Sequence, residues 1–222
     1  MRVKIVKRIP FEDLRKMIAE VPLMKPAADG SQIHPYRNAK IGLRQFSADH
    51  VNPPTFYLIR RNLEIQRALR SHLMADHGID PLRLSGALEI RNENGEIWTL
   101  TPPIVEFTPR HVFYVPQPGE LDHGQRRTRI YVPLICDGAH RVGVAREAGG
   151  DFIGVSIEGA DDAYPYYAHP NGWGDVKIVD EVPGTMDEKK MYLLADSYAL
   201  YRDFSRIGCG KPRHVGEGDK GG

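Results

Sequence analysis

The sequence predicts an α/β domain of the α+β kind, with a small mixed sheet, flanking helices and a β-hairpin insertion. Three observations lead to this prediction. Two apolar runs enclose a helical segment, Val142–Ala148. Two alternating runs enclose an Asn-Gly turn, and Leu63–Asp76 has apolar residues at helical spacing. At 222 residues and 41% hydrophobic content, the chain is long enough for one domain with a sizeable core.

The first third is expected to contain two helices and two short strands. Arg2–Lys7 alternates like a strand, and Pro10–Glu20 predicts a helix because its apolar residues recur every three or four positions. Val21–Pro54 is rich in Pro, Gly, Asn and Ser, which predicts a long irregular region with at most short elements. Thr55–Arg60 predicts a strand that leads into the amphipathic helix Leu63–Asp76.

A hairpin and a longer arm are expected in the middle of the chain. Ala87–Asn92 and Glu96–Leu100 flank an Asn-Gly pair, which is a strong signal for a tight hairpin turn. Pro102 and Pro103 precede an apolar run, Ile104–Phe107, that predicts a strand. The polar segment 110–129 predicts a loop or a hairpin arm.

The remaining elements surround the central turn. Thr128–Ile135 and Phe152–Ile157 predict strands, and Asp175–Val179 a further short one. Thr185 and Glu188 have capping-box spacing, so a helix should follow. We expect that helix to bury Met191, Leu194, Ala195 and Tyr198. The sequence thus predicts a single domain over 1–207 with an N-terminal extension and a C-terminal helix, and a disordered, glycine-rich tail over 208–222.

Bulk composition narrows the protein class. There are 30 Lys and Arg against 29 Asp and Glu, so the net charge of +1 does not favour a nucleic-acid partner, although Arg126, Arg127 and Arg129 form a local basic patch. Two cysteines make no disulfide framework. No apolar run approaches the ~18 residues of a membrane span, and the first residues carry no signal-peptide pattern. We expect a cytoplasmic protein, and its oligomeric state is left open.

The segment Asp137-Gly138-Ala139-His140-Arg141 is the most informative part of the chain. It joins a predicted strand to a predicted helix start, where unpaired backbone N–H groups and the helix dipole favour anions. Gly138 and Ala139 permit close approach of a phosphate, while His140 and Arg141 can donate hydrogen bonds to it. Asp137 can hold Mg²⁺. The alternative is a helix start capped by Asp137 with solvated side chains.

This segment resembles the ParB/sulfiredoxin superfamily. ParB-type domains have a GxRR-like turn here, sulfiredoxins a GCHR turn and free serine kinases a DGHHR turn, all of which bind nucleotide phosphates. The strand motif xPIxV that usually precedes the turn is matched by Pro103-Ile104-Val105, and the preceding amphipathic helix by Leu63–Asp76. The resemblance covers about 100–159 and is nearest the serine-kinase branch.

Two departures limit what the resemblance implies. Sulfiredoxin chemistry needs a cysteine directly before the His-Arg pair, but that position is Ala139, so sulfinic-acid reduction is not expected. ParB proteins continue into a helix-turn-helix domain, whereas only one helix and a loose tail are expected after Val182, so a partition protein is not expected. The serine kinases also use an early glutamate as general base, for which Glu12 and Glu64 are the candidates by position.

Two further groups are candidates for chemistry. Glu106, near the end of its strand, is a candidate catalytic base or second Mg²⁺ ligand beside Asp137, or else it faces solvent. The loop 164–173 is rich in aromatic residues and rigidified by prolines, so it either walls a ligand pocket or packs as a lid over the core. Its candidate substrate-binding residues are Tyr166, Tyr167, His169, Asn171 and Trp173.

Together these features predict a nucleotide-dependent phosphotransferase, a kinase-like enzyme for a small metabolite. ATP or ADP with Mg²⁺ would be the cofactors, with Asp137, His140 and Glu106 in catalytic roles. The alternative is a non-catalytic nucleotide-binding or nucleic-acid-associated ParB-like module that uses the same turn.

Overall fold

The structure, a computed structural model, describes residues 2–113 and 127–209. Within these residues the central sheet has four strands in the order β2-β8-β6-β7. β8 pairs antiparallel with β2 and parallel with β6, and β6 pairs antiparallel with β7, so the sheet is mixed, as predicted. The bounds are β2 Lys40–Ser47, β6 Ile104–Phe113, β7 Arg127–Asp137 and β8 Asp151–Glu158.

The predicted hairpin belongs to a second, antiparallel sheet in the order β1-β4-β5. Its strands are β1 Val3–Pro10, β4 Gly86–Asn92 and β5 Ile97–Leu100. Gly95 has a φ of +81° in the turn between β4 and β5, as the Asn-Gly signal implies. A separate parallel pair joins β3, Tyr57–Ile59, to β9, Lys177–Val179.

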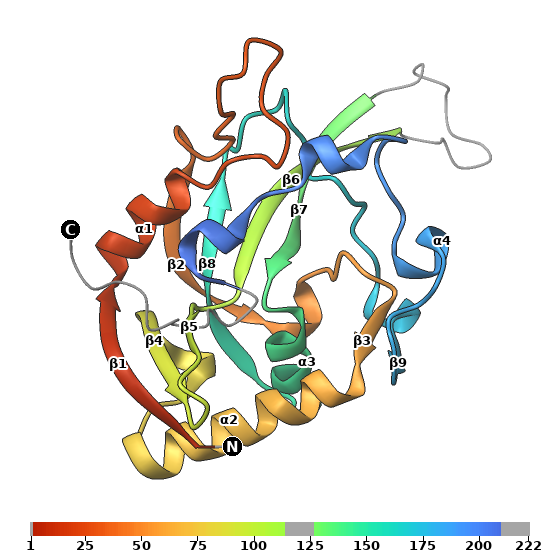
Figure 1. The fold of residues 1–222 in the computed structure, drawn as a ribbon. Helices are drawn as coiled ribbons and strands as arrows, with labels where there is room; N and C mark the ends of the chain where they lie inside the picture. The colour runs from red at the N-terminus through yellow and green to blue at the C-terminus, as the bar shows by residue number, and fades with distance from the viewer. Residues whose placement is uncertain (1, 114–126, 210–222) are drawn as a thin grey trace.

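Helices lie on the flanks of the sheets (Figure 1). α1, Phe11–Ala19, buries Leu14 and Ile18 against the central sheet. α2, Arg60–His77, ends at Gly78 in a left-handed conformation and passes beneath α3, Ala139–Glu147. Both α1 and α2 were predicted, because apolar spacing is a strong signal in segments of this length. No helix among the described residues is long and apolar enough to cross a bilayer.

Two predictions about the elements were wrong. The region 21–54 contains an eight-residue strand, β2, whose isolated apolar residues and edge position leave only a weak alternation pattern. The expected C-terminal helix is also absent: the capping box of Thr185 and Glu188 forms, but α4 ends after one turn, Met186–Lys189.

The residues expected to be buried by that helix face solvent instead. Met191 and Leu194 are each 56% exposed and Tyr198 is 61% exposed. Ala195 is also exposed. The segment packs instead through Leu200, Phe204 and Ile207, which join the core at the end of irregular turns. Residues 210–222 of the predicted tail lie outside the described residues.

Candidate functional site

The predicted turn between strand and helix is present, and glycine is required at its centre. β7 ends at Asp137, and Gly138 precedes α3 with a φ of +86°. A Cβ at this position would lie 2.8 Å from the Arg141 side chain and 3.1 Å from the Pro103 Cα atom. Backbone conformation and space therefore both demand glycine here. The first N–H groups of α3 have no partner within the helix, so they face the space in front of the turn.

Arg141 braces this turn from inside the protein. Its side chain is only 9% exposed, and Nη2 donates to Asp137 Oδ2 at 2.7 Å. Nη1 donates to the carbonyl oxygen of Thr101, just before β6. The guanidinium group therefore neutralises Asp137 and ties the turn to the neighbouring segment. Because the Arg141 guanidinium group is already paired, the positive potential at the turn comes mainly from the N-terminus of α3.

His140 links the turn to the start of α2. Its Nε2 atom accepts a hydrogen bond from the N–H group of Ile59 at 3.0 Å, so the neutral ring carries its proton on Nδ1. Burial lowers the pKa of His140 below its ordinary value; the nearby Asp137 opposes this shift, and Arg141 adds to it. The ring is therefore neutral at pH 7, with one N–H available as a donor.

A pocket of about 300 Å³ lies in front of the turn, between α2, β5 and the start of α3. The surface that lines this pocket is mainly polar. The lining residues are Asn62, Gln66, Trp98, Thr99, Leu100, Asp137, Gly138, Ala139, His140, Arg141 and Cys209. All five residues of the predicted turn thus share one pocket, although their binding role stays a prediction.

Half of this lining was not anticipated from the sequence. Asn62 and Gln66 are four residues apart on α2, so they present their amides on the same side of the helix. A polar residue at Gln66, within an otherwise apolar stripe, was the available signal. Trp98 and Thr99 come from the hairpin, and no local pattern indicated that β5 would lie opposite the turn.

Glu106 does not line the pocket, which contradicts its expected place beside Asp137. Its carboxylate is 1% exposed, accepts a hydrogen bond from the Tyr36 hydroxyl at 2.7 Å and lies 3.3 Å from an Arg202 nitrogen. Alternation along β6 places Glu106 on the face of Ile104 and Tyr36, whereas Val105 faces α3. Glu106 is therefore a core ion-pair partner and not a candidate base for the pocket.

The other candidate bases are also outside the lining of the pocket. Glu12 is exposed and ion-paired with Arg15 at 2.7 Å, and Glu64 is exposed on α2. Neither lines the pocket. Among the described residues no group of three His, Cys, Asp or Glu side chains is arranged to hold a metal ion. Asp137 is thus the one acidic side chain in the pocket lining.

The five candidate substrate-binding residues of loop 164–173 do not line the pocket either. Tyr166 and Tyr167 pack in the core with Leu134, their ring centroids 4.6 Å apart. Trp173 donates to the Ala48 carbonyl at 2.9 Å, and Asn171 is 7% exposed. The alternative interpretation, a lid that packs over the core, describes these four residues. His169 lies at a different pocket.

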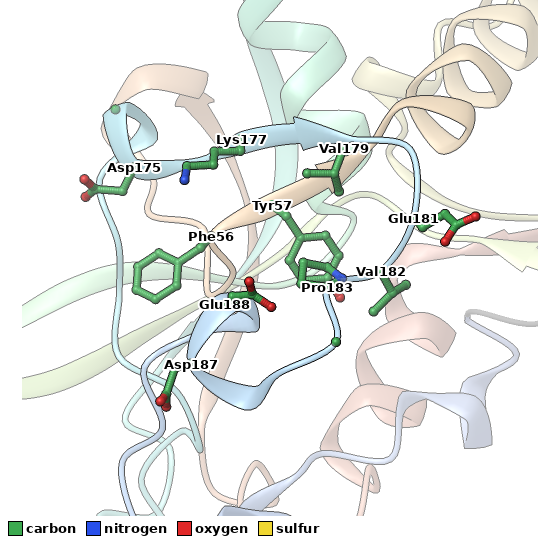
Figure 2. A pocket seen from close by; sticks show the side chains of 12 residues that line it. Phe56, Tyr57, Asp175, Lys177, Val179, Glu181, Val182, Pro183, Asp187 and Glu188 are labelled. Atoms are coloured by element: carbon green, nitrogen blue, oxygen red, sulfur yellow. The ribbon is translucent and has the colours of Figure 1, made fainter.

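A larger pocket, with a volume of about 860 Å³, lies elsewhere, beside β3, β9 and α4 (Figure 2). Apolar side chains such as Phe56 and Val179 line it together with a single lysine, Lys177. Its acidic members are Asp175, Glu181, Asp187 and Glu188. This charge balance opposes a phosphate ligand, so size alone does not make it the nucleotide site.

Comparisons with known proteins agree with the architecture around the turn. No curated protein and no solved structure matches the chain. A family model described as the ParB CE domain matches residues 13–178. The match begins within α1, includes the central sheet, α2, the turn and α3, and stops within β9. The chain therefore belongs to the ParB CE domain family.

Proposed function

We propose that the pocket in front of Gly138 binds a nucleotide, with its phosphates at the N-terminus of α3. The observation that carries the proposal is the left-handed glycine turn, which leads from a strand directly into a helix start that opens on a polar pocket. Such a helix start offers unpaired N–H groups and a positive dipole end to a phosphate. The neutral His140 adds one donor.

The rest of the lining supplies groups suited to the remainder of a nucleotide. Trp98 offers an aromatic face, and Asn62 and Gln66 offer amide donors and acceptors. Mg²⁺ is usually held by one or two carboxylates together with phosphates and water. Asp137 fits that requirement, because Arg141 occupies only one of its carboxylate oxygens at hydrogen-bonding distance. ATP or ADP with Mg²⁺ is therefore the proposed ligand set.

Phosphoryl transfer to a small metabolite is the second candidate function. It is favoured by the placement of His140 and Asp137 at the same pocket and by the likeness of the turn to that of free serine kinases. The described residues supply no second carboxylate there to accept a proton from an acceptor hydroxyl. Binding without turnover, as in a nucleotide-controlled or nucleic-acid-associated module, therefore requires fewer additional assumptions.

Nucleotide binding is tested by thermal unfolding with ATP, ADP, CTP and GTP, each with and without Mg²⁺. A nucleotide at about 100 times its Kd should stabilise the native state by roughly 2.7 kcal/mol. Gln66→Glu adds a negative charge to the pocket without changing its shape, and should weaken this shift. Ala68→Glu places the same charge on an exposed position of α2 outside the pocket and should not. Equal shifts in both variants, or no shift with any nucleotide, would refute the proposal.

Two further measurements separate the candidate functions. Nucleotide consumption that depends on an added hydroxyl compound, such as a free amino alcohol or hydroxy acid, would establish the phosphotransferase. Nucleotide binding without turnover, combined with DNA binding that weakens steeply with salt, would favour the nucleic-acid-associated module.

A further inference from the structure

A second pocket, of about 400 Å³, lies between β6, β7 and loop 164–173. Its polar lining brings together segments that the sequence singled out separately, namely His169 of the aromatic loop and Arg129 of the basic patch. Arg110 and His111 of β6 complete the basic set, and Asp162 is its one carboxylate. None of these residues lines the pocket in front of the glycine turn.

The single carboxylate of this pocket is already neutralised. Asp162 accepts two hydrogen bonds from Arg129 Nη2, at 2.5 Å and 2.6 Å. The same guanidinium group lies over the Tyr131 ring, 5.0 Å from its centroid. This pair is therefore held in place and contributes no net charge to the pocket.

Arg110 has no such partner among the described residues. Its Nη1 and Nη2 atoms donate to the carbonyl oxygens of Pro109 and Ala168, at 2.9 Å and 3.1 Å. Its Nε atom is buried without a hydrogen-bond acceptor. Burial lowers the pKa of Arg110 below its ordinary value, although an arginine still remains protonated at neutral pH. Glu106 opposes this shift, but that carboxylate lies in the core and is paired with Arg202. A half-buried guanidinium group that has no hydrogen-bonded carboxylate of its own favours an anion beside it.

Two histidines line the same pocket as Arg110. Burial lowers the pKa of His169, and the nearby Arg110 lowers it further. His111 is exposed at the same pocket. The neutral His169 ring can donate an N–H group to an oxygen anion.

We propose that this pocket binds the anionic group of a small metabolite, a carboxylate or a phosphate monoester, between Arg110 and His169. The site is independent of the proposed nucleotide pocket. Net positive charge, a volume in the range of small-molecule sites and donors from one strand and a loop all favour such a ligand.

The proposal is tested by titrating the protein with inorganic phosphate and, separately, with succinate, while backbone amide signals are followed by NMR. The amides of His169 and Leu193, both at this pocket, should shift with saturation for at least one of the two anions. The more tightly bound anion identifies the preferred group. Saturable shifts confined to the Gly138 turn would overturn the proposal.

Variants test whether His169 contributes to anion binding. His169→Glu should weaken binding about tenfold or more, as expected when one charge-assisted hydrogen bond is replaced by repulsion. His50→Glu makes the same substitution at an exposed site away from the pocket, and Gln66→Glu alters only the turn pocket. Both controls should retain affinity within about twofold. Equal weakening in the three variants would show a general charge effect and refute the site.

Arg110→Gln tests the central charge, because glutamine keeps a hydrogen-bond donor but removes the cation. Loss of anion binding in a folded Arg110→Gln protein supports the proposal, and unchanged affinity contradicts it. If the variant does not fold, the His169→Glu comparison decides the question alone. Nucleotide-induced thermal shifts should persist in His169→Glu, so failure of this proposal is distinguishable from failure of the nucleotide proposal.

Discussion

Removing the Arg202 side chain should cost a large part of the folding free energy. Its Nη2 atom lies 3.3 Å from Glu106, and its Nε atom donates to the Tyr36 hydroxyl at 3.2 Å. Both members of the ion pair are 1% exposed at the side chain. The remaining donors satisfy backbone carbonyl oxygens of three residues, Tyr164, Pro165 and Leu200.

The magnitude follows from what Arg202→Met leaves behind. Methionine fills similar space but leaves the Glu106 carboxylate buried without a cation, together with three unpaired carbonyl groups. Breaking one side of a buried ion pair typically costs about 3–5 kcal/mol. Domains have only about 5–15 kcal/mol of stability in total, so the variant should be marginally folded.

Urea unfolding measures this loss of folding free energy in four proteins, namely wild type, Arg202→Met, Glu106→Gln and the double variant. We expect the double variant to lose less than the sum of the single changes, because the second substitution removes the orphaned charge. A loss below about 1 kcal/mol in Arg202→Met, or simple additivity, would show that the pair does not hold the C-terminal segment to the sheet.

Three further predictions concern the turn and the titrating groups. Gly138→Ala should destabilise the protein by about 2–4 kcal/mol in urea unfolding, from left-handed backbone strain and overpacking, while Gly174→Ala, at a site with open space, should cost far less. The pKa of Lys190 is lowered by burial to about 8, so between pH 8 and 9.5 the unfolded chain binds more protons than the native state. The stability of wild type relative to Lys190→Met should therefore rise by about 1–2 kcal/mol over this range, and a constant difference would contradict the assignment. Burial raises the pKa of Cys136 well above its ordinary value and that of Cys209 to about 12, so iodoacetamide at pH 8 should label both rapidly only in urea; rapid labelling of the native protein would refute this.

The sequence was sufficient to predict elements whose signals are local. Helices α1 and α2, the Asn-Gly hairpin and the strand–turn–helix around Gly138 all follow from periodicity or turn chemistry. The capping box at Thr185 also forms, but a cap stabilises only the first turn of a helix. After Lys189 no apolar stripe meets a sheet surface, so the expected helix does not continue.

Long-range neighbours account for the errors at the site. Glu106 was correctly placed on a strand, but its partner Arg202 comes from a segment with no recognisable pattern. Likewise, the pocket wall from β5 depends on how the second sheet packs against the central one. Pairings between distant segments leave little trace in one sequence, so the turn was predicted and its opposite wall was not.

The ion pair between Glu106 and Arg202 also orders events during synthesis. The two residues are 96 positions apart, so a growing chain exposes the carboxylate well before its cation exists. Until Arg202 leaves the ribosome, the centre of β6 holds a charge that cannot be buried without large cost. The centre of the sheet is therefore expected to become fully stable only once Arg202 is present, and a chain truncated before Arg202 should unfold in less urea than the full chain.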